Sequence, residues 1–560
     1  MQIHDDGLQP YSTMAGKLDS KLLQALKAQG FEYMTPVQQR ILNELPDWRS
    51  DCLVQAKTGT GKTIAFLLPT LHCLLSGREA APRGQVAVLI ITPTRELAQQ
   101  IAKSCNELTS QFKHPPECHT AVGGTARKSA LSRFLDGNPS VLVATPGRLK
   151  DYLDEPEAAR KLGNIRTLIL DEADTMLEAG FLADVKHILR SLPPKSTGWQ
   201  GMCFSATVPP KVRGVVSVVL KPGYKSILAV EGNETPTHER VPQYHVVMPS
   251  VVDTFTTLTS LLQYETKNNK KIIVFGFTAN LVALIYDVFS QGLTSLPVFE
   301  IHSKLTQPAR TKTTSQFKET ESGILFASDV VGRGMDFPNV DLVVQVGLPS
   351  SPDQYVHRVG RTARAGNDGR AILLITEPEF FFVNVNPKLP IKRHPDTDLI
   401  TKSASSCAEP VMECMYKVDE KSKQRAYSSY IGYFAGSSLM KKLGLDRPGL
   451  VRLANDLAIR GMACPEPPPM DPKTVGKMGL KGVPGFVYMT SDQKANKGRP
   501  SPKPKSDMPP FSSKPGSDDW AGAAALGHPK PKPNVPGGGN RGFGADRNRH
   551  RGGRGRKQGP

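Results

Sequence analysis

The sequence predicts an α/β protein with two successive domains, each built on a parallel sheet. Short apolar, β-branched runs alternate with segments of helical spacing in two series. Polar residues gather at the carboxyl ends of these runs, as in parallel strands covered by helices on both faces. Because 39% of the 560 residues are hydrophobic and 22% are charged, neither wholesale disorder nor a collagen-like rod is expected.

The first series lies in residues 1–230. After Pro93, apolar residues recur at helical spacing on one face, at Leu97, Ile101, Cys105 and Leu108. This range is expected to form the first domain. Its expected strands are DCLVQA, QVAVLIITP, SVLVATP, TLILDEAD and MCFSAT.

The second series lies in residues 244–384, after a polar segment with two prolines at residues 231–243 that predicts a flexible linker. Residues 385–490 carry helical patterns around SSYIGYFAGSSLMKKLG and GLVRLANDLAIRG, and are expected to form a helical C-terminal extension. The expected strands of the second domain are KIIVFGFT, VFEIHS, GILFASDV, DLVVQVG and GRAILLIT.

Residues 491–560 are expected to form a disordered basic tail. They hold 15 basic and 5 acidic residues, 11 prolines and 13 glycines, and few large apolar side chains. Such a segment cannot bury enough surface to offset its ordering entropy. Its final arginine-glycine pattern is typical of segments that bind single-stranded nucleic acid, with a solubilising tail as the alternative.

Several classes of protein are excluded by composition. No window approaches eighteen consecutive apolar residues, so no membrane-spanning protein is expected. The eight cysteines lack zinc-ligand or disulfide-framework spacing. The first twenty residues contain three acids and one lysine, which fits neither a secretory signal nor a transit peptide. Either the chain stays where it is made, or its true N-terminus is not shown.

A phosphate-binding loop is predicted between the strand DCLVQ and the helix TIAFLLPTLHCLL. Glycines would let backbone N–H groups close around phosphates, Lys62 would reach the β and γ oxygens, and Thr63 would hold Mg²⁺. A glycine-rich turn with an accidental lysine is the alternative. The loop residues are Ala56, Lys57, Thr58, Gly59, Thr60, Gly61, Lys62 and Thr63.

Acidic residues follow the strand TLIL, at the sheet edge where ligands of open α/β folds bind. We expect Asp171 to anchor Mg²⁺ and Glu172 to orient or deprotonate an attacking water. The acidic start of a helix is the alternative interpretation. Together with the phosphate loop, Asp171-Glu172-Ala173-Asp174 indicates a hydrolytic site.

The segment HRVGRTAR (357–364) carries an arginine at every third residue, so its arginines are expected on one side of a helix. An unpaired arginine cluster needs an anion opposite it, and a γ-phosphate across an interdomain cleft is such an anion. We expect Arg361 and Arg364 to complete the catalytic site from the second domain. A surface arginine stripe is the alternative.

From Leu18 to Thr376 these residues resemble the DEAD-box RNA helicases. The resemblance implies two tandem RecA-like domains, a Q motif within residues 16–38, ATP as the bound nucleotide, and ATP-dependent RNA unwinding. The motifs that carry it are GFEYMTPVQ (30–38), AKTGTGKT, PTREL (93–97), Gly123-Gly124, TPGR (145–148), DEAD, Ser205-Ala206-Thr207, VFGFT (274–278), Gln307 to Arg310, SDVVGRGMD (328–336) and HRVGRTAR.

The resemblance also implies roles for single residues. Gln38 would read the adenine edge, with Tyr11 a candidate for the family's upstream aromatic. Gly334 and Asp336 would lie at the ribose. Two residues, Ser205 and Thr207, would couple hydrolysis to domain movement, although a plain polar turn is the alternative. The fifth motif departs from the commoner TDVAARGLD, and activity is expected to survive this change.

RNA contacts implied by the resemblance involve hydroxyls, glycine backbone and arginines rather than base-reading aromatics. Such groups suit phosphates and 2′-OH groups, so sequence-independent recognition of the RNA backbone is expected. The residues are Pro93, Thr94, Arg95, Gly123, Gly124, Thr145, Gly147, Arg148, Gln307, Arg310, Ser328 and Asp329.

Within the family, GRGMDFPNV, residues 441–444 and DPKTVGKMGLKGVPGF resemble the fungal mitochondrial DEAD-box helicases that act as RNA chaperones in group I and group II intron splicing. This resemblance implies an enzyme of the mitochondrial matrix. A monomer is expected, and protein partners are not predicted. The alternatives are ribosome biogenesis in the nucleus or nucleolus, an ATP-gated RNA clamp within a ribonucleoprotein, and a DNA translocase.

Overall fold

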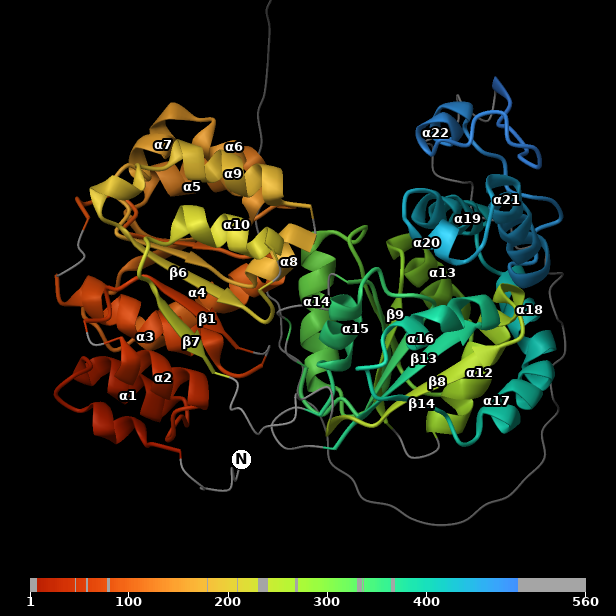
Figure 1. The fold of residues 1–560 in the computed structure, drawn as a ribbon, viewed down its shortest axis with the longest axis horizontal. Coiled ribbons are helices and arrows are strands. Elements are labelled where there is room, and N and C mark those ends of the chain that lie inside the picture. Colours follow the sequence, from red (N-terminus) through yellow and green to blue (C-terminus); the bar gives the residue numbers. More distant parts are fainter. Residues whose placement is uncertain are drawn as a thin grey trace, which may run out of the picture. The chain divides into compact units, whose positions relative to one another are not determined.

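Two seven-stranded sheets dominate the structure, a computed structural model, and every strand pairing in them is parallel (Figure 1). This confirms the predicted α/β class with two parallel-sheet domains. The described residues are 8–45, 47–56, 59–77, 81–178, 180–208, 210–229, 240–266, 270–329, 335, 337–363 and 368–491.

The strand order of the first sheet, β3-β4-β2-β5-β6-β1-β7, brings the ends of three strands together. Gln55 at the end of β1 faces Ser205 at the end of β6, and Leu170 at the end of β5 faces Cys203. The polar segments after β1, β5 and β6 therefore share one sheet edge. The strands are β1 (Cys52–Gln55), β2 (Val88–Ile91), β3 (Glu117–Ala121), β4 (Pro139–Ala144), β5 (Thr167–Leu170), β6 (Gln200–Ser205) and β7 (Lys225–Leu228).

Helices cover both faces of this sheet (Figure 1). In β1, Cys52 and Val54 belong to one apolar layer and Leu53 to the other, which is the two-residue alternation of a strand. The first layer is completed by α1 (Ser20–Ala28), α2 (Pro36–Glu44), α3 (Lys62–Leu75) and α4 (Arg95–Thr109). The second is completed by α5 (Arg127–Asp136), α6 (Pro146–Leu153), α7 (Pro156–Lys161), α8 (Ala173–Glu178), α9 (Leu182–Ser191) and α10 (Pro210–Val219).

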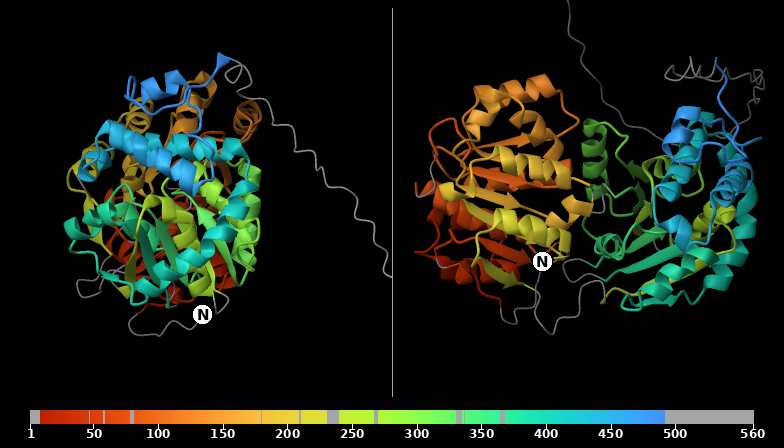
Figure 2. Two further views of the ribbon diagram at one scale, coloured as in Figure 1. Left: turned by 90° about the vertical axis from the view of Figure 1, so that its right-hand side faces the viewer. Right: turned by 45° about the horizontal axis from the view of Figure 1, so that its top comes forward.

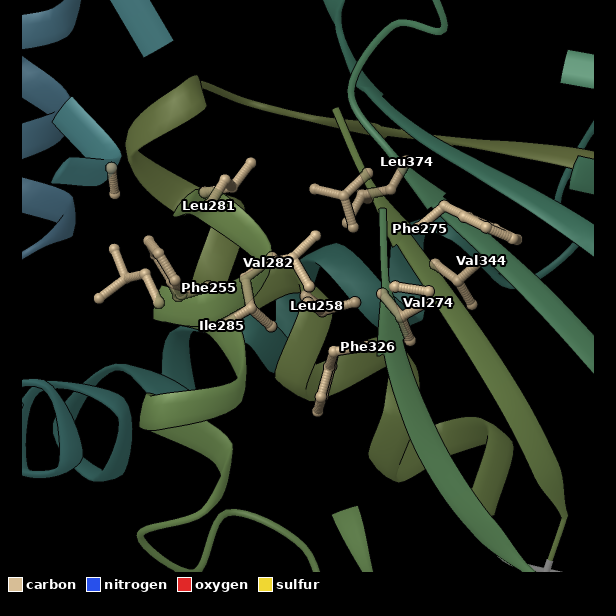
Figure 3. Packing of buried hydrophobic residues seen from close by; sticks show 14 of the residues in the cluster. Phe255, Leu258, Val274, Phe275, Leu281, Val282, Ile285, Phe326, Val344 and Leu374 are labelled. Carbon is tan, nitrogen blue, oxygen red and sulfur yellow. The ribbon is translucent and has the colours of Figure 1, made fainter. Parts of the chain in front are cut away.

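The second sheet has the order β10-β11-β9-β12-β13-β8-β14. Its strands are β8 (Gln243–Met248), β9 (Lys271–Gly276), β10 (Val298–Ile301), β11 (Gly323–Ala327), β12 (Leu342–Val346), β13 (Arg370–Thr376) and β14 (Ile391–Arg393). Its helices are α12 (Thr254–Glu265), α13 (Ala279–Phe289), α14 (Gln307–Glu319), α15 (Pro352–Val359) and α16 (Phe381–Val385). Figure 3 shows side chains of α12 and α13 packing against β9, β11, β12 and β13.

The segment predicted as a helical extension is mostly helical and shares the core of the second domain. Ile431 and Phe434 lie in the same buried cluster as Phe275 of β9. In both views of Figure 2 the extension, coloured from teal to blue, lies beside this domain. Its strand β14 pairs with β8 and forms an edge of the sheet. Its helices are α17 (Thr397–Ser403), α18 (Ala408–Tyr416), α19 (Glu420–Ala435), α20 (Leu439–Lys442), α21 (Arg447–Asp456) and α22 (Pro472–Lys477).

Aromatic residues of α19 cover the loop that follows β9. The ring of Phe277 lies 4.8 Å from that of Tyr433 and 5.9 Å from that of Tyr430. The Tyr433 hydroxyl donates to the carbonyl oxygen of Leu348 at 3.0 Å. The extension is thus part of the packing of the second domain.

None of the described helices has both the length and the hydropathy needed to cross a bilayer. All eight cysteines are free thiols, and only Cys118 is partly exposed.

Candidate functional site

The predicted phosphate loop joins β1 to α3. Gly59 and Gly61 have φ values of 81° and 87°, which glycine adopts without strain. Because Gly61 is the N-cap of α3, the free N–H groups of the first helical turn follow it directly. Lys62 is only 7% exposed, and its Nζ donates to the carbonyl oxygen of Ala56 at 3.1 Å. Thr63 lies half-buried in the same turn.

Three carboxylates are buried where β5 ends, at Asp171, Glu172 and Asp174. Burial raises the pKa of Asp171 to about 7; the charge of Lys62 opposes this rise, and the charges of Glu172 and Asp174 add to it. Glu172 has a φ of 50°, which is uncommon for a side chain of its type. Its Oε2 is buried and has no hydrogen-bond partner among the described residues. A cation at this cluster would compensate the buried negative charge.

Asp174 ties this acidic segment to the segment after β6. Its Oδ2 accepts from the backbone N–H groups of Ala206 and Thr207 and from the Thr207 hydroxyl, at 2.9–3.1 Å. Ser205 accepts from the Asp174 N–H and donates to the Thr207 carbonyl oxygen. Burial would raise the pKa of Asp174, but the charges of His357 and Lys62 and the backbone N–H bonds outweigh it and lower that pKa.

Gln38 connects the Q motif to the phosphate loop. It is buried in the first turn of α2, where Thr35 and Gln38 form a capping box. Its Nε2 donates to the carbonyl oxygen of Gly61 at 3.2 Å, and its Oε1 accepts from the Tyr11 hydroxyl at 2.7 Å. A Cβ on Gly61 would lie 2.5 Å from Nε2, so only glycine leaves room for this amide.

The predicted helical stripe of arginines is wrong. The helix α15 ends at Val359, before Arg361. Ala363 has a φ of 52°, a left-handed conformation that does not continue a right-handed helix. Residues 360–363 therefore form turns and bends, and Arg358 and Arg361 do not share one helical face.

The two arginines that the structure describes within 358–364 have partners in the second domain itself. Arg358 is buried, and its Nε lies 2.8 Å from Oδ1 of Asp329. Arg361 is buried too, and it donates to the carbonyl oxygens of Met335 at 2.7 Å and His357 at 3.2 Å. Both guanidinium groups are held by their own domain. Five predicted nucleotide residues lie outside the described residues: Lys57, Thr58, Gly334, Asp336 and Arg364.

The predicted RNA residues of the first domain converge on one loop. Arg95 begins α4 and lies against Gly123 and Gly124; a Cβ on Gly123 would be 2.8 Å from its Nη2. Arg148, in α6, donates to the carbonyl oxygen of Thr125 at 3.1 Å. Two helix starts supply further hydroxyls and backbone to this set, at Pro93, Thr94, Thr145 and Gly147.

Glu96 is a site residue that was not predicted from the sequence. This buried carboxylate accepts from Gln307 Nε2 at 2.8 Å and pairs with Arg310 Nη2 at 2.6 Å, so it joins the start of α4 to the start of α14. Burial lowers the pKa of Arg310, and the Glu96 charge opposes that shift. The only signal in the sequence was the glutamate within PTREL itself.

Two further predicted RNA residues follow β11. The Ser328 hydroxyl is buried, with no hydrogen-bond partner among the described residues. Asp329 is partly exposed and pairs with Arg358. The carboxylate of Asp329 is thus oriented by a buried guanidinium of the second domain.

Comparison with known proteins identifies the family. The family model "DEAD/DEAH box helicase" matches residues 35–215, and "Helicase conserved C-terminal domain" matches residues 253–366. A relative from Aspergillus oryzae, named ATP-dependent RNA helicase mss116, mitochondrial, is 73% identical over 513 residues, covering 90% of this chain and 81% of the relative. The chain belongs to the DEAD-box ATP-dependent RNA helicases. A relative of the same name from Phaeosphaeria nodorum is 55% identical over 480 residues, covering 85% and 86% of the two chains.

Solved structures of DEAD-box helicases share this fold. Mss116p bound to ssRNA and AMP-PNP matches with a TM-score of 0.72 and 27% identity, over 87% of this chain and 99% of that chain. Mss116 bound to ssRNA and UDP-BeF matches with a TM-score of 0.72 and 28% identity, over 86% and 98% of the two chains. The family and the two RecA-like domains predicted from the motifs are confirmed.

Proposed function

We propose that this DEAD-box helicase hydrolyses ATP to separate short RNA duplexes locally in mitochondria, where it assists the splicing of group I and group II introns. The observation that carries the proposal is the set of buried polar residues at one edge of the first sheet: Lys62, whose charge acts on the buried Asp171, and Asp174, which is bonded to residues 205–207. The mitochondrial names of the two relatives support the location.

The phosphates of ATP would lie on the loop at residues 56–63, where the start of α3 presents N–H groups and Lys62 supplies a cation. Glu172, with its unpartnered buried Oε2, would orient the attacking water and accept its proton. The residues also fit Mg²⁺, because this ion needs only one or two protein ligands beside phosphate and water. Asp171 and Thr63 would hold Mg²⁺, which neutralises charge that develops on the phosphates.

Residues of both domains would complete the nucleotide site. Gln38 would read the adenine, and Gly334 and Asp336 would bind the ribose. Arg361 and Arg364 would stabilise the transferring phosphoryl group from the second domain, an effect worth roughly 10³ to 10⁵ in rate for arginine fingers. Hydrolysis would then depend on the approach of the two domains.

RNA would be held by its backbone. Arg95 and Arg148 flank the glycine loop of the first domain, while Ser328 and Asp329 present a hydroxyl and a carboxylate from the second. The arginines suit phosphates, whereas the hydroxyl and the carboxylate suit 2′-OH groups rather than base edges. The extension would enlarge this surface, and residues 491–560 would tether the enzyme to RNA without sequence preference.

A strand-displacement assay tests this proposal. We expect ATP-dependent separation of a short RNA duplex, slower separation of the matched DNA duplex, and no separation by Lys62→Ala. ATP turnover without displacement would favour the RNA clamp, whereas equal activity on DNA would favour a translocase. Either result would overturn the helicase proposal.

A further inference from the structure

The side-chain amide of Gln38 has no free acceptor site. Its Oε1 accepts from the Thr35 backbone N–H at 2.7 Å and from the Tyr11 hydroxyl at 2.7 Å. An amide oxygen has two lone pairs, and both are in use here. The Nε2 group donates to the Gly61 carbonyl oxygen at 3.2 Å, which uses one of its two hydrogens. Among the described residues, Gln38 therefore has one donor to spare and no acceptor.

The orientation of this amide follows from its partners. A backbone N–H can only donate and a carbonyl can only accept, so Thr35 fixes the oxygen and Gly61 fixes the nitrogen. The Tyr11 hydroxyl is not needed for this orientation. It only occupies the second lone pair.

Recognition of adenine by an amide needs that lone pair. Adenine offers a donor at N6 and an acceptor at N7, and glutamine reads both atoms at once. Guanine also has an acceptor at N7 but carries an acceptor at position 6. An amide that offers only a donor cannot distinguish the two bases, because N7 is common to both. Selection of adenine thus requires the release of Oε1 by one of its two donors.

Tyr11 is held so that its hydroxyl faces this oxygen. Its backbone N–H donates to the Glu32 carbonyl oxygen at 2.9 Å, and the neighbouring Gln9 accepts from the Met34 N–H at 2.9 Å. The ring is 4% exposed. Burial raises the pKa of the Tyr11 phenol, so it remains a neutral donor. The Thr35 N–H belongs to the capping box of α2, which leaves the hydroxyl as the donor that can rotate away.

We propose that the Tyr11 hydroxyl is a specificity-determining group that masks the acceptor of Gln38 and must be displaced by the adenine of ATP. This inference rests on the proposed function, because it assigns the base of the nucleotide to Gln38. The mask lowers the affinity of the site for ATP and reduces its preference for ATP over GTP. It also ties adenine binding to the segment that precedes α1.

The test is Tyr11→Phe, which removes only the hydroxyl. We measure kcat and KM for ATP and GTP with saturating RNA, and the equilibrium affinity of the full-length protein for a non-hydrolysable analogue of each nucleotide. Loss of a competing neutral hydrogen bond should lower KM and Kd for ATP about two- to tenfold, with no comparable gain for GTP. The change should lie in KM rather than in kcat. If the preference for ATP over GTP, measured as the ratio of the two affinities, is unchanged or reduced in Tyr11→Phe, the proposal is overturned.

Two controls separate masking from a structural effect. Tyr224→Phe removes a hydroxyl from a partly exposed ring beside β7 of the same domain and should leave the preference for ATP over GTP unchanged. In a Gln38→Ala background, Tyr11→Phe should no longer alter the ratio of the affinities for ATP and GTP, because the masked acceptor is gone. A persistent effect in that background contradicts the proposal. If the wild-type protein hydrolyses neither nucleotide, the proposed function fails. The equilibrium affinities for the ATP and GTP analogues still test whether Tyr11 masks Gln38.

Discussion

The carboxylate of Asp174 holds Thr207 through two hydrogen bonds, from the backbone N–H at 2.9 Å and from the side-chain hydroxyl at 3.1 Å. The same oxygen accepts from the Ala206 N–H at 3.0 Å. The segments after β5 and β6 are therefore joined beside the proposed ATP site. A displacement of Asp174 during hydrolysis would be passed to residues 205–207.

Thr207→Val removes the hydroxyl bond and keeps the shape of the side chain. Hydrogen bonds to a charged group contribute about 1.5–3 kcal/mol. We expect strand displacement to fall about tenfold while RNA-stimulated ATP hydrolysis falls much less. Both rates are measured on the same short RNA duplex. Thr197→Val, which removes a hydroxyl bonded to the exposed Pro194 carbonyl, is the matched control. Parallel loss of both rates would argue against coupling.

Lys62→Ala should abolish ATP hydrolysis. Removal of one preorganised cation or donor at a transferring group costs about 10²- to 10³-fold in rate. Phosphate release in the presence of RNA measures this effect. Lys103→Ala, at an exposed lysine of α4, should turn over at the wild-type rate. Turnover by Lys62→Ala within threefold of wild type would contradict the phosphate-loop assignment.

Asp171 makes the stability of the nucleotide-free protein depend on pH. Its pKa rises from 3.8 to about 7 on folding, so the folded state binds more protons than the unfolded state and loses stability as pH rises from about 4 to about 7. Asp171→Asn cannot ionise, and its Tm should exceed that of wild type by a margin that grows between pH 5 and pH 8. A shift of about 2–4 °C is expected for each kcal/mol. A margin that shrinks over this range would contradict the raised pKa.

Glu96 and Arg310 should be strongly coupled. Removal of one partner of a buried ion pair destabilises a protein by about 3–5 kcal/mol, because the other charge stays buried without a partner. We expect Glu96→Ala and Arg310→Ala each to weaken RNA-stimulated ATP hydrolysis, and the double variant to lose far less than the sum. Glu107→Ala breaks an exposed ion pair with Lys103 and should lower the free energy of unfolding by at most about 1 kcal/mol. If the losses of RNA-stimulated ATP hydrolysis add up in the double variant, the contact between Glu96 and Arg310 does not contribute to this activity.

Deleting residues 491–560 tests the basic tail. Lost phosphate contacts should weaken RNA binding and flatten its dependence on salt, while RNA-stimulated ATP hydrolysis stays largely intact. Binding of single-stranded RNA is measured between 50 and 200 mM salt, a range over which ~6–10 phosphate contacts change affinity about 10³- to 10⁵-fold. If the dependence of RNA affinity on salt is unchanged by the deletion, the tail does not bind RNA and its alternative role, in solubility, is favoured.

The sequence revealed the strands that are buried on both faces. Their runs of valine, isoleucine and leucine are unbroken, as in β2 and β13. Three of the strands that it missed, β3, β7 and β14, lie at sheet edges. In β3 and β7 only Ala121 and Ile227 are buried, so neither an apolar run nor a regular alternation marks them. The fourth, β8, begins at Gln243, the last residue of the predicted linker, and His245 in it is also buried.

The candidate site was predicted where its residues are contiguous and missed where partners are distant in sequence. The loop at residues 56–63 and the acids at 171–174 carry their chemistry in one short string. The bonds of Glu96 to Arg310 and of Tyr11 to Gln38 depend on the fold, and no local pattern indicates them. The arginine stripe failed because spacing alone does not reveal that the helix stops at Val359.

The edge strand β14 and the rings of α19 bear on how this enzyme can be shortened. A recombinant fragment that stops at Thr376 would contain all helicase motifs, yet it would leave the hydrogen-bonding edge of β8 uncovered and the ring of Phe277 without Tyr433. Uncovered strand edges invite aggregation. The smallest soluble motor would therefore retain the chain as far as the aromatic helix, well past the last helicase motif.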